Sequence, residues 1–276
     1  MIQLEPHNYF KVTNPLKEVT INTLFVQAVV EKKVTGKIYV DNTEIPKTFL
    51  IVHPYGMSLL FGDVNNDIFN TMFVDYALNT FKIRQHYEWL QAFPDVWHEK
   101  LRILFGDKLI KAEDNTGSDQ NIRIEENTRV NFKFNQEKYL AFRSTIPENK
   151  YQILRTDQAM YENMNGSVVP KYFWTDAEQF QNQGVGFSLF FDDNLVSTAY
   201  SSFITKTQLE IGIETNEIFR GKGFALLTCA ALIDYSIAHN LEPIWACKFE
   251  NTGSYLLAQK LGFEPTHYHP YYRLIY

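Results

Sequence analysis

The chain reads Arg220-Gly221-Lys222-Gly223-Phe224-Ala225 at the junction between an expected strand over residues 208–215 and an expected helix over residues 222–239. Two glycines and a small residue let the backbone bend tightly, so successive N–H groups can point into one space. The following helix adds its unpaired N-terminal N–H groups and the positive end of its dipole. Because Arg220 and Lys222 add local positive charge, the segment predicts a cradle for a pyrophosphate.

Two other phosphate-binding loops do not fit this segment. A Walker loop requires Ser or Thr directly after Gly-Lys, and here Lys222 is followed by Gly223. A dinucleotide fingerprint requires a third glycine where Leu226 stands. From the residues alone, the choice lies between a pyrophosphate cradle and a simple glycine-rich turn that carries two basic residues.

The elements expected around the loop alternate as in α/β domains. Three strands precede it, over residues 186–191, 195–203 and 208–215. After the helix, residues 243–247 predict a short apolar strand, and Asn251 can cap a second helix that ends before Gly262. The order strand, helix, strand, helix predicts parallel strands joined by a right-handed crossover.

Together these residues resemble a known family, the GCN5-related N-acetyltransferases (GNAT). The loop is similar to the family's acyl-CoA pyrophosphate motif, written Gln/Arg-x-x-Gly-x-Gly/Ala. Residues 251–263 resemble its second motif, in which an Asn and a Ser lead into Lys-Leu-Gly-Phe. Over residues 184–265, with Trp245-Ala246-Cys247 before the Asn, the chain looks closest to the zwittermicin A resistance-type subgroup.

The resemblance implies a mixed α/β fold with a central mixed sheet in the C-terminal half, and acetyl-CoA as cosubstrate. It also implies that backbone amides of the loop hold the pyrophosphate and that a strand edge runs beside the pantetheine arm. The implied cofactor-binding residues are Ile211, Ile213 and Thr215 in the strand, Arg220, Gly221, Lys222, Gly223, Phe224 and Ala225 in the loop, and Asn251 and Ser254 near the thiol.

Acetyl transfer to an amine requires a base that removes a proton from the amine and a proton source for the departing thiolate. Because strand side chains alternate, Glu210, Gly212 and Glu214 are expected on one face. Either carboxylate could attract a cationic amine and take its proton, and Glu210 is the first candidate because it lies deeper in the strand. The alternative is a pair of solvated charges on an exposed face.

The acid is less well marked in the sequence. Many family members carry a Tyr four residues before the Gly of Gly-Phe, and in this chain that position is Ala258. Tyr255 lies three residues earlier on the same expected helix, so it shares a face with Ala258 and is the candidate acid. The alternatives are a tyrosine that only packs and a reaction without a dedicated acid.

Composition limits the classes of function. A net charge of −6 over 276 residues gives no global positive field for nucleic acid or anionic lipid. The chain shows neither a signal peptide nor an apolar run of about 20 residues, which predicts a cytoplasmic protein without membrane association. Cys229 and Cys247 lie in apolar surroundings and are expected as buried, reduced thiols. No metal is expected, because no cluster of ligand residues has a metal-binding spacing.

The first half of the chain mixes helix and strand signals. Its expected helices cover residues 20–31, 67–81 and 95–106, and its expected strands cover residues 37–40, 48–52 and 57–61. A polar run within residues 111–129 is the candidate linker. We therefore expect a smaller α+β domain over residues 1–140 and the acetyltransferase domain over residues 141–276. The first domain could be a degenerate copy of the same fold, a wall of the acceptor pocket or a homodimer interface.

The sequence thus predicts an acetyl-CoA-dependent N-acetyltransferase that transfers acetyl directly to a primary amine of a small molecule in a ternary complex. The small acceptor rests on the resemblance to the resistance-type subgroup, and a protein acceptor is a further alternative. Ala258 favours a different class, a non-catalytic acyl-CoA-binding or sensor protein. A third class is an interaction module in which the glycine loop is only a turn.

Overall fold

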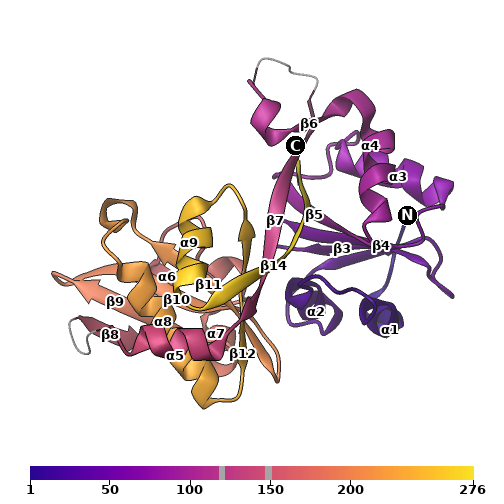
Figure 1. The fold of residues 1–276 in the computed structure, drawn as a ribbon. Coiled ribbons are helices and arrows are strands. Elements are labelled where there is room, and N and C mark those ends of the chain that lie inside the picture. The colour runs from indigo at the N-terminus through magenta and orange to yellow at the C-terminus, as the bar shows by residue number, and fades with distance from the viewer. Residues whose placement is uncertain (118–121, 147–150) are drawn as a thin grey trace. The chain divides into compact units, whose positions relative to one another are not determined.

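The computed structural model describes residues 1–117, 122–146 and 151–276, and it divides into two compact units (Figure 1). Unit 1 consists of Met1–Val130, Lys248–Glu250 and Tyr268–Tyr276, and unit 2 consists of Asn131–Cys247 and Asn251–His267. Two long strands, β7 (Ile124–Phe134) and β14 (Phe263–Leu274), belong partly to each unit. The chain therefore returns to unit 1 at its end, whereas the sequence predicted one boundary after residue 140.

The stretch expected as a linker contains regular structure. Residues 124–129 are part of β7, although only Ile124 among them is apolar, so the start of the strand carries no alternating pattern in the sequence. The short strand β6 (Leu109–Lys111) pairs in parallel with the start of β7. Residues 118–121 of the expected linker, and residues 147–150 of the expected boundary region, lie outside the described residues.

Unit 1 is built on a mixed sheet with the strand order β1-β2-β3-β4-β5-β14-β7. Its first five strands are β1 (Ile2–Gln3), β2 (Lys37–Val40), β3 (Thr48–His53), β4 (Met57–Gly62) and β5 (Glu88–Phe93). Its helices are α1 (Thr13–Leu16), α2 (Leu24–Val30), α3 (Asp67–Ala77) and α4 (Val96–Phe105). The helix expected over residues 67–81 ends at Ala77, because Asn79 and Lys82 adopt left-handed backbone angles.

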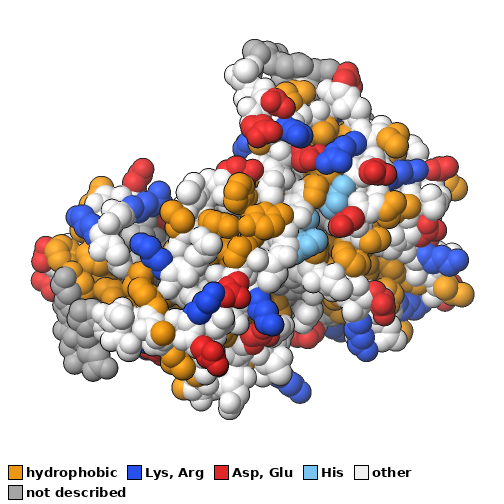
Figure 2. Space-filling view, viewed as in Figure 1, with side chains coloured by type: hydrophobic (Ala, Val, Ile, Leu, Met, Phe, Trp, Pro, Cys, Tyr) orange, Lys and Arg blue, Asp and Glu red, His pale blue; other side chains and the backbone are white. Residues whose placement is uncertain are grey.

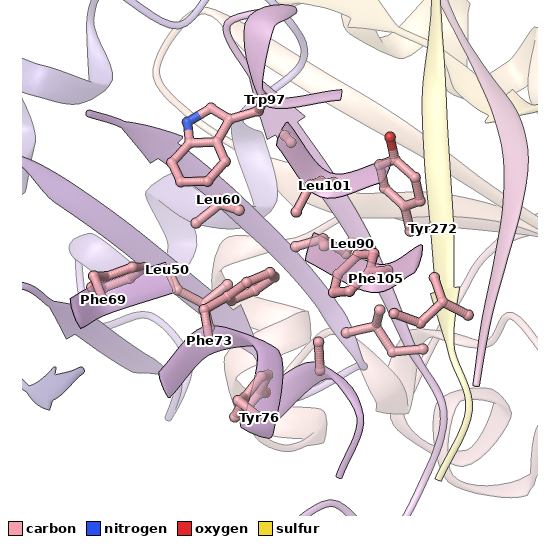
Figure 3. Packing of buried hydrophobic residues seen from close by; sticks show 14 residues of the cluster. Leu50, Leu60, Phe69, Phe73, Tyr76, Leu90, Trp97, Leu101, Phe105 and Tyr272 are labelled. Carbon is pink, nitrogen blue, oxygen red and sulfur yellow. The ribbon is translucent and has the colours of Figure 1, made fainter. Parts of the chain in front are cut away.

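The core of unit 1 follows from the spacing of its apolar residues. Phe69 and Phe73 lie one helical turn apart on α3, and Trp97, Leu101 and Phe105 are spaced in the same way on α4. Figure 3 shows these rings and side chains converging with apolar residues of β3, β4, β5 and β14. All of them are buried, so each amphipathic helix covers one apolar face of the sheet.

Unit 2 contains a five-stranded sheet with the order β12-β11-β10-β9-β8. These strands are β8 (Gln152–Arg155), β9 (Gly186–Phe191), β10 (Asn194–Ile204), β11 (Gln208–Thr215) and β12 (Glu242–Ile244). Its helices are α5 (Gln136–Arg143), α6 (Gln158–Asn163), α7 (Ala177–Gln183), α8 (Phe224–Ala238) and α9 (Thr252–Lys260). The expected mixed sheet is confirmed, because β9, β10 and β11 are antiparallel while β11 and β12 are parallel.

The strand expected over residues 243–247 is two strands, and Trp245 separates them. The first, β12, pairs with β11 from Gln208 opposite Glu242 to Glu210 opposite Ile244. The second, β13 (Ala246–Lys248), is placed next to β7, and the Phe132 N–H donates to the Trp245 carbonyl at 3.2 Å. The prediction of one strand was wrong because the apolar character of a segment does not show which neighbouring strand it pairs with.

Within residues 1–117, 122–146 and 151–276, every helix is too short or too polar to span a lipid bilayer. On the face drawn in Figure 2, acidic and basic side chains are interspersed among the described residues, without a continuous basic field.

Candidate functional site

The glycine loop in unit 2 has the bent backbone that its sequence predicts. Gly221 and Gly223 have φ angles of +78° and +85°, a left-handed conformation that side chains other than glycine rarely adopt. A Cβ atom at either position would meet nothing within 4 Å, so the space beside both glycines is open. The helix α8 begins directly after this loop, at Phe224.

The N-terminus of α8 carries donors that the helix itself cannot satisfy. Gly223 is the N-cap and brings no side chain to cap the helix. In an α-helix the first N–H groups, here those of Phe224, Ala225 and Leu226, lack acceptors within the helix. Together with the positive end of the helix dipole, these groups can bind an anion such as a pyrophosphate.

The two basic residues of the loop have different environments. Arg220 donates from Nε to the Thr215 carbonyl at 3.1 Å, and its Nη2 lies 3.3 Å from Oε1 of Glu214. Lys222 is exposed, and its ammonium lies 5.0 Å from the centroid of the Phe219 ring. Arg220 therefore shapes the loop, while Lys222 remains next to the open space as a local positive charge.

One edge of β11 is open beyond the point where β12 leaves it. The last pair between these strands is Glu210 with Ile244, yet β11 continues to Thr215. The Thr207 carbonyl points toward β12, because it accepts from the Glu242 N–H. The Asn216 N–H points toward β10, because it donates to the Val196 carbonyl. By this alternation, the backbone groups of Ile211 and Ile213 point to the side that β12 has left. They can bond to an extended ligand that carries amide groups.

Glu210, Gly212 and Glu214 share the face of β11 that points away from α8. Thr215 lies on the opposite face, which α8 covers. Its hydroxyl lies 2.8 Å from the Ser197 hydroxyl, and the Ser197 hydroxyl lies 3.2 Å from the hydroxyl of Thr228 on α8. Glu210 is only 5% exposed, and the side chain of Glu214 is 10% exposed. The alternative of two solvated charges is therefore wrong.

The carboxylate of Glu214 is engaged by two segments of unit 2. Oε2 accepts from the N–H groups of Ser167 and Val168 at 2.8 and 2.9 Å. Oε1 pairs with Arg220, as described above. The sequence gives no sign of these partners, because Ser167 and Val168 are distant in the chain and bond through their backbone N–H groups.

Tyr200 is a site residue that sequence reasoning missed. It lies opposite Gly212 in the β10–β11 pair, and it is fully buried. A Cβ at Gly212 would stand 2.9 Å from the Tyr200 hydroxyl, so the phenol lies between the positions of the two carboxylates. A glycine in the middle of a strand is the available signal, because it marks a close approach of another group.

The start of α9 is built as the sequence predicts. Asn251 is confirmed as the N-cap, since its Oδ1 accepts from the Ser254 N–H at 3.2 Å. The Ser254 hydroxyl accepts from the indole N–H of Trp245 at 3.2 Å, so α9 is tied to the point where β12 and β13 separate. The ring of Tyr255 lies 5.6 Å from that of Phe132, and Ala258 is completely buried.

Cys229 and Cys247 are confirmed as buried thiols that form no disulfide. Burial raises the pKa of the Cys229 thiol, which makes it a poor nucleophile. Among the described residues, no group of three or more His, Cys, Asp or Glu side chains could hold a metal ion.

Unit 1 repeats the element order of unit 2 without the features of this site. Its parallel strands β4 and β5 stay paired from Met57 opposite Trp89 to Phe61 opposite Phe93, so they do not separate. The helix after β4 is capped by Asn66, whose Oδ1 accepts from the Phe69 N–H at 3.0 Å. In the part of the chain that the structure describes, the open loop and the open strand edge therefore occur together only in unit 2.

The chain is similar to known proteins over most of its length. A family model described as GNAT acetyltransferase matches residues 14–272. A Bacillus subtilis protein described as the uncharacterized N-acetyltransferase YdfB is 25% identical over 252 residues, which cover 90% of this chain and 89% of that protein.

Solved structures show the same fold. A GCN5-related N-acetyltransferase-like protein from Streptococcus suis superposes with a TM-score of 0.70 at 21% identity, over 98% of this chain and 100% of the other. A tandem GNAT protein from the clavulanic acid biosynthesis pathway superposes with a TM-score of 0.62 at 10% identity, over 99% and 97% of the two chains.

Proposed function

The chain belongs to the GNAT acetyltransferase family, and from this we propose that unit 2 transfers an acetyl group from acetyl-CoA to a primary amine of a small molecule. The observation that carries the proposal is the juxtaposition in unit 2 of an anion-binding loop and an open strand edge. The loop is Arg220–Ala225, and the edge is formed by Ile211 and Ile213.

The residues of the site fit the parts of acetyl-CoA in chain order. The N–H groups from Gly221 to Ala225 receive the pyrophosphate, and Lys222 adds a neutralising charge. The open edge of β11 receives the pantetheine amides, as a strand receives a neighbour. The five steps between the six residues from Glu210 to Thr215 span roughly 16 Å at about 3.3 Å each, which suits an extended arm with its thioester near Glu210.

Glu210 is the proposed general base. It lies on the face away from α8, at the last position where β11 and β12 are paired. In direct transfer, the carboxylate removes the proton from the ammonium group, by itself or through one water, and the neutral amine attacks the thioester carbonyl. The C–N bond forms as the C–S bond breaks, the sulfur leaves as a thiolate, and the nitrogen releases its second proton to water to give the neutral amide.

The thiolate then needs a proton, and Tyr255 is the proposed donor. It lies in the first turns of α9, one turn before the buried Ala258. The assignment is supported by the attachment of α9, since the Trp245 indole N–H donates to the Ser254 hydroxyl at the point where β12 and β13 separate. We assign Asn251 and Ser254 to this end of the cofactor site.

The acceptor is proposed as a small cationic amine. The support is the buried acidic face of β11 and the resemblance of residues 184–265 to the zwittermicin A resistance-type subgroup. A second function, an acyl-CoA-binding or sensor protein without turnover, is favoured by Ala258, which leaves the usual acid position without a hydroxyl.

Calorimetric titration with acetyl-CoA tests the cofactor site. We expect the wild-type protein to bind with micromolar affinity and Gly223→Trp to lose binding, because the indole would fill the open space beside the helix N-terminus. Gly106→Trp is the matched control, since Gly106 also has a positive φ angle and open surroundings but lies in unit 1. A folded wild-type protein that binds no acetyl-CoA would overturn the proposal.

A screen of primary amines with released CoA thiol as the readout tests the reaction. For an accepted amine, Glu210→Gln should lower kcat/KM about 100-fold, in the range expected for loss of a general base, with acetyl-CoA affinity retained. Binding of acetyl-CoA without turnover of any amine would favour the sensor function instead.

A further inference from the structure

Glu214 joins two segments of unit 2 that are far apart in the sequence. Its Oε2 atom accepts the N–H groups of Ser167 and Val168 at 2.8 and 2.9 Å and lies 3.3 Å from the Ser167 hydroxyl. Its Oε1 atom lies 3.3 Å from Nη2 of Arg220, the first residue of the glycine loop. Both oxygens are therefore used in holding other groups, which distinguishes Glu214 from a carboxylate that waits for a substrate proton.

Glu214 holds the start of a segment that covers residues 166–174. This segment lies over the acidic face of β11, which is the face that carries Glu210 and Glu214. A Cβ at Gly166 would stand 2.6 Å from Cγ and Oε2 of Glu214, so this glycine permits a close approach of the backbone. Further along, the Trp174 indole N–H donates to the Ser201 carbonyl at 2.8 Å, and the Phe173 ring packs 5.8 Å from that of Tyr200. The segment is thus fixed at both ends across β10 and β11.

A cavity of about 220 Å³ adjoins this link. Its lining includes Met160 of α6, Met164 and Asn165 of the stretch between α6 and Gly166, and Glu214 itself. A change in the hydrogen bonds of Glu214 would therefore move a wall of the space on the acidic face of β11.

We infer that Glu214 is a positioning residue that couples occupation of the glycine loop by the pyrophosphate to the conformation of residues 166–168, an inference that rests on the proposed function of unit 2. The Arg220 side chain is 58% exposed, and its bonds to Thr215 and Glu214 use Nε and Nη2, which leaves Nη1 for a further acceptor. A phosphate in the loop can engage Nη1 and fix the guanidinium in place. A fixed Arg220 orients the carboxylate, and the oriented carboxylate holds the Ser167 and Val168 N–H groups.

Such coupling is reciprocal. If CoA binding strengthens the link between Glu214 and residues 166–168, then weakening that link must lower the affinity for CoA by the same factor. The substitution Glu214→Gln keeps the shape of the side chain but removes its charge, which reduces both the pairing with Arg220 and the acceptor strength toward Ser167 and Val168.

Hydrogen–deuterium exchange of the full chain, with and without saturating CoA, tests the inference. In the wild-type protein we expect CoA to slow exchange of the Ser167 and Val168 amides about fivefold or more, the lower range of typical coupling between sites. In Glu214→Gln, CoA should leave that exchange unchanged, and the CoA dissociation constant should rise by a similar factor.

The matched control is Glu217→Gln, which removes the same charge from an exposed residue on the approach to the loop. It should preserve both the CoA-dependent protection and the affinity. Wild-type protein that binds CoA without any change at residues 167 and 168 would overturn the inference and leave the proposed function intact. Absence of CoA binding would instead overturn the proposed function.

Discussion

The phenol ring of Tyr200 on β10 lies across the backbone of Gly212 on β11, and a Cβ at residue 212 would stand 2.5 Å from the Tyr200 Cζ atom. No real Cβ tolerates such a contact, so the glycine is what permits this tyrosine to lie between Glu210 and Glu214. The pair explains why a strand rich in isoleucine and glutamate is interrupted by a glycine at its centre.

The first prediction follows from this contact. Gly212→Ala should destabilise the protein by about 1–3 kcal/mol, because the ring of Tyr200 must move within a packed core. Chemical denaturation measures the change, and the double variant with Tyr200→Leu should cost less than the sum of the two single variants. Gly253→Ala on α9 is the control, since the nearest atom to its Cβ would be 3.8 Å away. If Gly212→Ala changed the free energy of unfolding only as much as Gly253→Ala does, the Tyr200 ring would be able to move aside without strain.

A second prediction concerns the loop glycine itself. Gly223→Ala should lower acetyl-CoA affinity at least tenfold, because alanine disfavours the φ angle of +85° and its methyl group enters the space beside the helix N-terminus. Gly106→Ala has a comparable backbone strain, with φ of +50°, but should leave the affinity unchanged. Calorimetry on both variants separates loss of the cradle from general loss of stability. Equal affinities in the two variants would remove the loop from the cofactor site.

A third prediction concerns the attachment of α5 to α8. The Tyr139 hydroxyl donates to the Ala230 carbonyl at 2.9 Å and also bonds to Asp234, which pairs with Arg143 at 2.8 Å. Tyr139→Phe leaves a buried carbonyl with one donor fewer and should destabilise the protein by about 1–2 kcal/mol. Tyr235→Phe on α8 should change the free energy of unfolding by less than about 0.5 kcal/mol. The prediction fails if the two variants unfold at the same denaturant concentration.

Local signals in the sequence predict the elements of unit 2 well. The apolar run after Gly223 is confirmed as α8, and Asn251 with Gly262 bounds α9 as expected. These features depend on neighbouring residues only: a glycine in a left-handed conformation, an asparagine cap and a periodic apolar face. The roles of the loop and of Glu210 in binding and catalysis stay predictions.

Contacts between distant segments could not be read in the same way. Trp245 separates β12 from β13 because its carbonyl bonds to Phe132, which is more than a hundred positions earlier in the chain. Two partners of Glu214 are likewise backbone groups, the N–H groups of Ser167 and Val168, and backbone groups carry no mark in the sequence. The last strand, β14, pairs with β5 of unit 1 in a register from Tyr272 opposite Leu90 to Leu274 opposite Glu88. No property of residues 268–276 alone indicates that partner.

The last prediction concerns the pH dependence of stability and a histidine of unit 1. His53 is fully buried, and burial lowers its pKa from 6.5 to about 3. Its Nδ1 accepts from the Tyr55 N–H at 3.1 Å, which requires the neutral ring. Between pH 6.5 and about 3 the unfolded chain binds a proton at His53 and the folded chain does not. The free energy of unfolding should therefore fall as the pH falls, by about 1.4 kcal/mol per pH unit from this residue.

His53→Asn tests this dependence, because asparagine also offers an acceptor to the Tyr55 N–H but does not titrate. The variant should be less stable at neutral pH, where a smaller side chain leaves a packing defect, yet its stability should fall less steeply between pH 6.5 and 4.5. Urea denaturation across this range measures the difference in slope, and His7→Asn, an exposed histidine, should reproduce the wild-type slope. If His53→Asn also reproduces it, then His53 takes up a proton in the folded protein, and the acceptor role of Nδ1 is wrong.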